Sequence, residues 1–288
     1  MKKPSESSII ICSIVRNAEK GLRRNIPVIN ELCRHFRDYR IVVYENDSVD
    51  ATKVLLNSWM EHDSDHVAVM LNDTDASRTI PSASSISVNP FFSRKRIDKM
   101  ANLRNHYLDY VEKKNMSADY LMVVDLDVSQ LFVDTILSSF STESQEWDVV
   151  TAYGYSTSPS LKKRYHDTYA LVEYGMDDVP QTEKSIHDAA LNMADKMKEE
   201  KWVRVFSAFG GLAIYRFDSV KGLRYQVLDN DDSRVEVRCE HYSLYRQMAE
   251  RGFDKVFINP QMKLKYQDLT IRIIWNSMMR KLRKLLGA

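Results

Sequence analysis

The stretch Asp119-Tyr-Leu-Met-Val-Val-Asp125-Leu-Asp127-Val128 decides the fold of this chain. Its centre, residues 121–124, is a continuous apolar run, which predicts a strand buried on both faces. The run ends in two aspartates separated by one residue. Because a bare charge is costly inside a sheet, we expect both carboxylates to lie in a crevice at the carboxyl end of the strand and to share a cation.

Oxygen ligands suit Mg²⁺ or Mn²⁺, and such ions typically bridge a protein carboxylate to the phosphates of a nucleotide. Asp125 and Asp127 therefore predict a metal-assisted diphosphate site. A structural loop after the strand explains so short a pattern equally well. The metal interpretation requires both side chains to face a cavity and not to be tied up in ion pairs with neighbouring arginines.

Composition narrows the class of protein. A chain of 288 residues is long enough for one large α/β domain or two small ones. Its 41 basic and 40 acidic residues leave a net charge of +1, so nothing recommends nucleic acid as a partner. Cys12, Cys33 and Cys239 form no Cys-x-x-Cys pair, which favours a reducing compartment over disulfides or zinc. Without a signal-like segment or a run of ~20 apolar residues, we expect a cytoplasmic protein, peripheral at most at the inner face of the membrane.

The first half of the chain alternates strands and helices. Residues 8–15 and 40–45 are β-branched and apolar, which predicts two strands. Between them, residues 22–36 place apolar side chains three and four positions apart, as an amphipathic helix does. A strand, a helix and a strand on this scale form a βαβ unit, which makes the sheet parallel. Further strands are expected at residues 66–71, 147–153 and 255–260.

A polar cluster follows the second strand: Glu45, Asn46, Asp47, Ser48, Asp50 and Thr52. Asp50 or Ser48 is expected to cap the next helix, residues 51–60. In a nucleotide-binding α/β domain this position faces the ribose and base, so part of the cluster is assigned to sugar hydroxyls and the base edge. A purely structural turn is the open alternative.

The third strand leads into a long loop and a basic helix. The polar loop at residues 72–92 is long enough to suggest that it borders the active site. In the helix at residues 94–111, the basic residues 94–99 form a solvated face. Arg104 falls close to the apolar stripe, and either a phosphate or base contact or a solvated position is open for it.

Three features of the second half can carry chemistry. Residues 154–188 are rich in tyrosine, which suits either a sugar- or base-binding surface or ordinary packing. Gly210-Gly211 permits close approach of a ligand to the backbone, or else a tight turn. Glu240 and His241 stand in the first turn of a helix at residues 239–252, where the helix dipole favours a carboxylate.

The end of the chain, residues 264–288, is basic and amphipathic. Such a segment can lie in the plane of an anionic membrane, with each basic residue contributing about 1 kcal/mol near the surface. Docking back on the domain and forming a homodimer contact are the alternatives. The predicted organisation is one domain at residues 1–267, followed by a basic amphipathic helix at 268–288.

Six motifs in order resemble those of GT-A fold glycosyltransferases, and more narrowly those of the cryptococcal capsule-associated α-mannosyltransferase-like family. They span about residues 9–265 and comprise residues 13–19, 44–52 and 96–105, Asp125-Leu-Asp127, Phe209-Gly210-Gly211 and Cys239-Glu240-His241. The resemblance implies a single-domain α/β GT-A fold, with a mostly parallel, Rossmann-like sheet flanked by helices. It also implies a nucleotide-binding half at about residues 8–130 and an acceptor half at about 131–267.

The resemblance also implies roles for individual residues. Asp125 and Asp127 would hold Mn²⁺ or Mg²⁺ on the donor diphosphate, with Asp127 the more direct ligand and a catalytic residue. Glu240 would be catalytic or orient the acceptor, and His241 would contact the metal or a phosphate. The donor site would comprise Arg16, Asn17, Glu45, Asp47, Ser48, Arg104, Gly210 and Gly211.

The implied function is a metal-dependent hexosyltransferase. It would transfer a sugar from a GDP-mannose-like or UDP-sugar donor to a glycan or lipid-linked saccharide, in polysaccharide or lipopolysaccharide synthesis. One alternative is a nucleotidyltransferase, although the usual glycine-rich loop is missing because residues 12–24 contain only Gly21. The other is a non-catalytic protein that binds glycan or membrane on the same fold.

Overall fold

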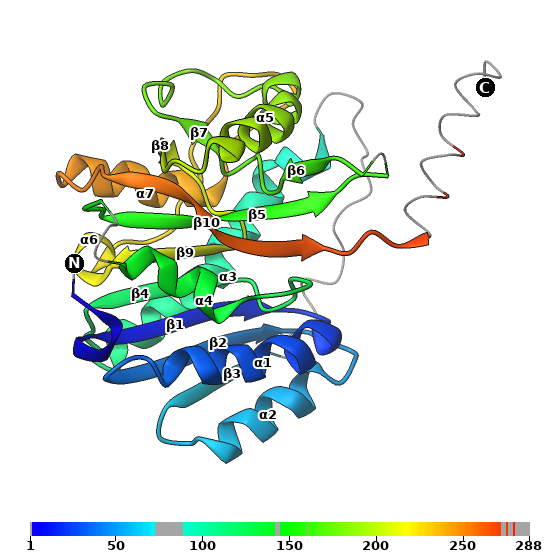
Figure 1. Cartoon of the computed structure of the whole chain (residues 1–288). Helices are drawn as coiled ribbons and strands as arrows, with labels where there is room; N and C mark the ends of the chain where they lie inside the picture. Colours follow the sequence, from blue (N-terminus) through cyan, green and yellow to red (C-terminus); the bar gives the residue numbers. More distant parts are fainter. Residues whose placement is uncertain are drawn as a thin grey trace.

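The computed structural model describes residues 2–72, 89–141, 145–159 and 161–271, together with residues 275 and 279. In this part of the chain ten strands form one sheet in the order β3-β2-β1-β4-β9-β5-β10-β8-β7, with β6 paired to β5 (Figure 1). The strands are β1 Ser8–Val15, β2 Asp38–Asn46, β3 Val67–Asn72, β4 Tyr120–Val124, β5 Val149–Thr157, β6 Lys163–Tyr165, β7 Val172–Glu173, β8 Val203–Ser207, β9 Leu212–Arg216 and β10 Val256–Gln267.

Helices cover both faces of this sheet. They are α1 Glu19–Cys33, α2 Thr52–His62, α3 Arg94–Lys113, α4 Val133–Leu137, α5 Glu183–Lys196, α6 Phe217–Val220 and α7 Glu240–Glu250. Short 3₁₀ turns are η1 Pro4–Glu6, η3 Pro90–Phe92, η4 Ser138–Phe140 and η5 Met197–Glu199. The predicted α/β fold is confirmed, and most predicted element boundaries lie within a few residues of the observed ones.

Strand direction changes in the middle of the sheet. The strands β3, β2, β1 and β4 are parallel, as the βαβ pattern predicts. Next to them β9 runs antiparallel to both β4 and β5, and β5 then pairs in parallel with β10. Local sequence does not indicate the direction of β9, because pairing partners far apart in the chain decide it.

The strands at the centre are buried on both sides, as their apolar runs predict. Ile9 and Ile11 of β1 join a core cluster with α1, α2 and α4, whereas Ile10 and Cys12 join a second cluster with α3 and α7. This alternation is the period of two that a pleated strand imposes. The same division separates the residues of β4, so two cores flank one sheet.

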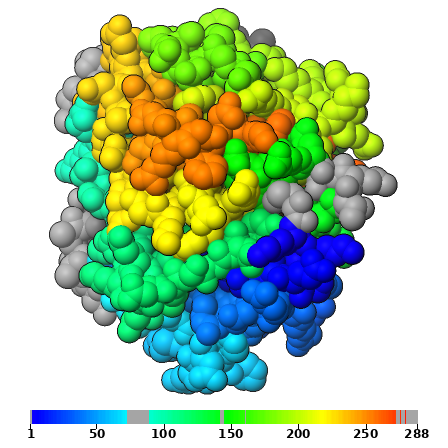
Figure 2. All heavy atoms as spheres, turned by 90° about the vertical axis from the view of Figure 1, so that its left-hand side faces the viewer, coloured from blue at the N-terminus to red at the C-terminus, as the bar shows by residue number. Residues whose placement is uncertain are grey.

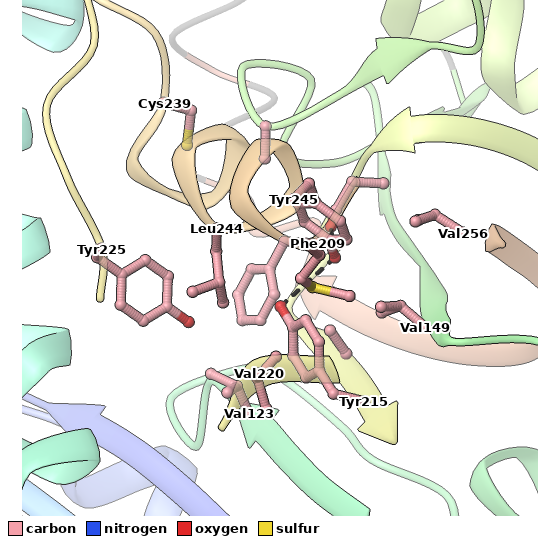
Figure 3. Close-up of a cluster of buried hydrophobic side chains, with 14 of the residues drawn as sticks. Val123, Val149, Phe209, Tyr215, Val220, Tyr225, Cys239, Leu244, Tyr245 and Val256 are labelled. Atoms are coloured by element: carbon pink, nitrogen blue, oxygen red, sulfur yellow. Dashed lines mark hydrogen bonds between the residues drawn. The ribbon is translucent and has the colours of Figure 1, made fainter. Parts of the chain in front are cut away.

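The second core fixes the position of α7. Figure 3 shows Leu244 and Tyr245 of this helix directed toward Phe209 and Tyr215. The Tyr245 hydroxyl donates to the carbonyl of Ala208 at 2.5 Å. The Tyr215 hydroxyl donates to the Tyr245 hydroxyl at 3.4 Å. On the face of the molecule shown in Figure 2, α6 in yellow lies beside the orange C-terminal part of α7. These contacts anchor α7, so its first turn has a fixed place beside Phe209.

The polar cluster after β2 joins two helices instead of capping one. The residue that precedes α2 is Ala51, and the Asp50 carboxylate just before it accepts from Thr52 N at 3.0 Å. The other oxygen of Asp50 accepts from Glu19 N at 3.2 Å, and Thr52 Oγ1 accepts from Ala18 N at 2.7 Å. Asp50 thus contacts the first turns of both α1 and α2.

Two predicted segments lie largely outside the described residues. The loop predicted at residues 72–92 falls mostly there, since residues 73–88 are not described. The basic segment predicted from residue 264 begins differently, because β10 continues to Gln267. Beyond it, Ile271 and Trp275 are exposed. None of the helices in the described part of the chain has the length and apolarity to cross a bilayer.

Candidate active site

A cavity of about 660 Å³ opens beside the carboxyl ends of β1 and β4. Its walls come from segments far apart in the sequence: the end of β1, the helix α3, the turn after β4, the loop after β6, and the first turn of α7. Asp125 and Asp127 both line it, which meets the first requirement of the metal interpretation. The other polar residues in the walls are Arg16, Asn46, Arg96, Lys99, Arg104, Asp167, Thr168, Tyr169, Cys239, Glu240, His241 and Tyr266.

The two aspartates are held in a buried turn. Asp125 N donates to the carbonyl of Gly211 at 2.9 Å, and the Tyr266 hydroxyl donates to Asp125 Oδ2 at 3.0 Å. Burial raises the pKa of Asp125 to about 7, with Arg104 opposing the shift and Asp127 adding to it. Burial also raises the pKa of Asp127. Asp125 is half-buried and Asp127 is exposed, and both line the cavity. Two like charges on one cavity wall repel each other unless a cation joins them.

The second requirement concerns ion pairs with arginine. Arg104 Nη2 and Asp125 Oδ1 form an ion pair of 3.8 Å, which is too long for a hydrogen bond, so Asp125 meets this requirement only in part. Within the described residues Asp127 forms no ion pair. The carboxylates thus fit a divalent cation, although no three metal-binding side chains converge in this part of the chain. Phosphate oxygens and water would have to complete the coordination, as is usual for Mg²⁺.

Arg104 lies inside the site. Its Nε donates to Glu240 Oε1 at 3.0 Å, and both residues are only 4 % exposed. Its guanidinium lies 5.0 Å from the ring centre of Phe209 and 5.9 Å from that of Tyr225. The solvated position left open by the sequence is therefore excluded. Arg94, in contrast, is exposed and pairs with Asp229 at the surface, as predicted for residues 94–99. That prediction is wrong for Arg96 and Lys99, which are half-buried and line the cavity.

His241 is buried with unused hydrogen-bonding capacity. It is 1 % exposed, its ring stacks on Phe209 at 4.0 Å, and in the described structure neither ring nitrogen has a hydrogen-bond partner. Burial, reinforced by Arg104, lowers its pKa, so the ring is neutral at pH 7. A neutral imidazole facing a cavity can donate to a phosphate or coordinate a metal. The structure does not gather it with Asp125 and Asp127 into a three-ligand group.

The loops after β1 and β2 divide the predicted donor residues. Asn17 N donates to Ser48 Oγ and Val49 N donates to Asn17 Oδ1, both at 2.9 Å, so Asn17 and Ser48 tie the loops together. Arg16 lines the cavity, and its buried Nε has no partner among the described residues. Glu45 accepts from Ser48 N at 2.5 Å, and its other oxygen is buried without a described partner.

Several predicted donor residues stand behind the cavity wall. Asn17, Glu45, Asp47, Ser48, Gly210 and Gly211 are not among its described lining residues, whereas Asn46 is. Asp47 is buried with a left-handed φ of 52°. Close packing explains why positions 210 and 211 are both glycine. A Cβ on Gly210 would come within 2.4 Å of the carbonyl of Ala152, and one on Gly211 within 3.0 Å of the Tyr266 ring.

Two residues of the site were not predicted. Asp167 lines the cavity with a left-handed φ of 65°, and no described group forms a hydrogen bond with its carboxylate. Burial, with the charges of Asp125 and Glu240, raises its pKa to about 8. Its position between tyrosines in a polar loop was the available signal. Tyr266 reaches Asp125 across 141 positions of sequence, so no local pattern could have indicated it. His166 stacks on the Tyr266 ring at 3.6 Å.

Comparison with known proteins identifies the family and the fold of this chain. The family model described as Cryptococcal mannosyltransferase 1 matches residues 8–244. Among solved structures, the mannosyltransferase PcManGT from Pyrobaculum calidifontis, described in complex with GDP-Man and Mn²⁺, aligns with a TM-score of 0.52 at 12 % identity. The alignment covers 98 % of this chain and 63 % of that protein.

A second solved structure is TarS of S. aureus, residues 1–349, in complex with UDP-GlcNAc. It aligns with a TM-score of 0.47 at 13 % identity, over 91 % of this chain and 59 % of TarS. This chain thus spans less than two thirds of the length of either structure. The family match covers most of the chain and confirms the resemblance carried by the six motifs. The chain belongs to the Cryptococcal mannosyltransferase 1 family of glycosyltransferases and has the GT-A fold.

Proposed function

We propose that this protein is a metal-dependent glycosyltransferase that moves a sugar from a nucleotide-diphosphate donor to a hydroxyl of a glycan or lipid-linked saccharide. The observation that carries the proposal is the pair Asp125 and Asp127, which both line one large cavity beside Arg104 and both have a raised pKa. In this proposal Asp127 and Asp125 bind Mn²⁺ or Mg²⁺. The cation would offset the charge that develops on the departing diphosphate.

Cations of the chain itself support an anionic ligand on the donor side. Arg16 and Lys99 both line the cavity, and burial together with the positive charge of Arg16 lowers the pKa of Lys99. Asp47 offsets part of the repulsion between Lys99 and Arg16, and a bound phosphate would offset more of it. We assign Arg16 and Lys99 to the donor phosphates, with Arg104 and the neutral His241 as further contacts. Glu45, Asp47, Asn17 and Ser48 then shape the loops beside the nucleoside.

The acceptor side is assigned to the loop after β6. Asp167, Thr168 and Tyr169 line the cavity there, near Phe92 and Ile186. Glu240, the predicted catalytic residue, already accepts hydrogen bonds from Arg104 and, at 3.4 Å, from Cys239 Sγ. These contacts favour a role for Glu240 in orienting Arg104. Asp167 has no such partner in the described structure. We therefore assign to Asp167 the hydrogen bond from the attacking hydroxyl, a task that suits a carboxylate of raised pKa.

The donor and the setting are proposed from the family. A GDP-mannose-like donor fits the family's description, and a UDP-sugar is the alternative. Residues 8–130 would form the donor half and residues 131–267 the acceptor half. The basic segment after Gln267 would bring the enzyme to an anionic membrane carrying a lipid-linked acceptor of polysaccharide or lipopolysaccharide synthesis. A homodimer contact is the other use of that segment.

Thermal unfolding in the presence of nucleotide sugars tests this function. A bound donor raises the unfolding temperature by mass action, and at 100 times its Kd the gain is about 2.7 kcal/mol. We expect a GDP- or UDP-sugar to stabilise the protein only when Mn²⁺ or Mg²⁺ is present. The product then distinguishes the enzyme classes: a glycosyltransferase releases nucleoside diphosphate, whereas a nucleotidyltransferase acting on a nucleoside triphosphate releases pyrophosphate. Absence of stabilisation by every nucleotide sugar would refute the proposal in favour of a non-catalytic protein.

A further inference from the structure

One face of α1 backs directly onto the turn that carries the two aspartates. Asn25 is fully buried, and its Nδ2 donates to the carbonyls of Leu126 at 3.0 Å and Val128 at 2.9 Å. Its Oδ1 accepts from Leu131 N at 3.4 Å. All the hydrogen bonds of the Asn25 side-chain amide are therefore made to backbone groups of residues 126–131, the segment that contains Asp127.

Gly21 stands one helical turn before Asn25 on the same face. A Cβ added at this position would come within 2.5 Å of the carbonyl oxygen of Leu126 and 2.6 Å of the Cα of Asp127. Such distances do not occur, so any larger residue would push the helix and the turn apart. The glycine lets α1 approach until the Asn25 amide reaches both carbonyls.

The two aspartates are held by different groups. Asp125 is fixed from the far side of the turn, by the Gly211 carbonyl and the Tyr266 hydroxyl. On either side of Asp127, the flanking carbonyls are held by Asn25. The direction in which the Asp127 side chain enters the cavity therefore depends on α1.

The same helix is fixed at its N-terminus to the loop after β2. At the start of α1, Ala18 N donates to Thr52 Oγ1 and Glu19 N donates to Asp50. Arg16, three positions before the helix begins, lines the cavity. Helix α1 thus sets the distance between Arg16, which we assign to the donor phosphates, and Asp127, which we assign to the metal.

We propose that Asn25 and Gly21 are positioning residues for the metal site, acting through Asp127. The inference rests on the proposed function, because it assumes that Asp127 binds the cation. Residues that orient a metal ligand typically change metal affinity by about 10- to 100-fold when replaced. A residue that only stabilised the fold would lower the unfolding temperature and leave the affinity of the folded protein unchanged.

The experiment measures Mn²⁺ binding by calorimetry at 10 °C, with GDP or UDP present, in the full chain. We expect Asn25→Ala to weaken Mn²⁺ binding at least about tenfold. The control is Asn30→Ala on the same helix, which removes a hydrogen bond from Trp59 Nε1 of 2.9 Å far from the turn. It should lower the unfolding temperature without changing Mn²⁺ affinity.

Gly21→Ala is the second variant and should also weaken Mn²⁺ binding. If Asn25→Ala does not fold, Asn25→Ser, which keeps a short donor, is measured in the same way and should bind more weakly than the wild type. Unchanged Mn²⁺ affinity in the folded variants of Asn25 and Gly21 overturns the inference. Failure of the wild type itself to bind Mn²⁺ with either nucleotide overturns the proposed function instead.

Discussion

The guanidinium of Arg104 and the carboxylate of Glu240 form a buried ion pair with an Nε to Oε1 distance of 3.0 Å. The pair joins the middle of α3 to the first turn of α7, across 136 positions of sequence. Asp125 lies on the other side of the same guanidinium, with 3.8 Å between Oδ1 and Nη2. The positive charge of Arg104 therefore interacts with both Asp125, a predicted metal ligand, and Glu240, the predicted catalytic carboxylate.

Replacing Arg104 with alanine should destabilise the protein by about 3–5 kcal/mol, because Glu240 would remain buried without its partner. The free energy of unfolding in urea measures this. The matched control is Arg94→Ala on the same helix, whose exposed pair with Asp229 should contribute less than about 1 kcal/mol. Equal losses in the two variants would contradict the buried pair as the structure has it.

Asp127→Ala should abolish turnover of the donor while the protein stays folded, since the substitution removes a metal ligand and not a core residue. The same loss is expected when excess chelator is added to the wild type. Turnover is followed as release of nucleoside diphosphate, and circular dichroism checks the fold. Full activity of this variant, or of the wild type in chelator, would disprove the metal role.

Asp167→Asn should separate the two substrates. We assign this residue to the acceptor hydroxyl. The variant should therefore bind the donor as the wild type does and should retain the slow background hydrolysis of the donor by water. Its rate of sugar transfer to the acceptor should fall at least about 100-fold. Donor binding is measured by the thermal shift with Mn²⁺. Asp178→Asn, in the loop after β7, is the control. Equal loss of hydrolysis and transfer would place Asp167 on the donor side instead.

The raised pKa of Asp167 also predicts how stability depends on pH. Its pKa in the folded protein is about 8, above the usual aspartate value of about 4, so folding disfavours the charged form. In metal-free protein the contribution of Asp167 to stability is therefore lost as pH rises from about 4 to 8, and it is constant above that range. Asp167→Asn should flatten this part of the curve of unfolding free energy against pH. An unchanged slope would show that Asp167 is not desolvated.

A chain that ends at Gln267 should stay folded and lose binding to anionic vesicles. The truncation keeps β10 and the contact from the Tyr266 hydroxyl to Asp125. It removes the basic segment proposed to lie on the membrane, where each basic residue contributes about 1 kcal/mol. Sedimentation with vesicles containing phosphatidylserine measures binding, and neutral vesicles are the control. Unchanged sedimentation of the shortened chain would refute the membrane role.

The basic segment after Gln267 also bears on oligomeric state. If it forms a homodimer contact instead, the truncation should halve the mass of the particle in solution without affecting vesicle binding. Light scattering on both chains distinguishes the two uses. An unchanged mass together with unchanged sedimentation would leave docking on the chain's own domain as the explanation.

Local sequence was sufficient for strands β1 to β4, for helices α1, α2 and α3, and for the two aspartates. The apolar run at residues 121–124 is buried on both faces because its side chains alternate between two cores. The amphipathic spacing of α1 and the apolar β1 and β2 require a βαβ unit, and the parallel pairing follows from it. Placing Asp125 and Asp127 at the end of the buried strand then places them in the cavity wall.

Long-range packing alone decided the rest of the site. The sequence could not show that β9 would insert in the antiparallel direction, that Tyr266 would reach Asp125, or that Arg104 would pair with Glu240. Each of these contacts joins residues about 90 to 140 positions apart, and neither periodicity nor capping extends so far along a chain. The sequence by itself determined that Asp125 and Asp127 face the cavity. The tertiary structure added Asp167 and determined which groups surround these carboxylates, because burial and charge pairing depend on the whole sheet.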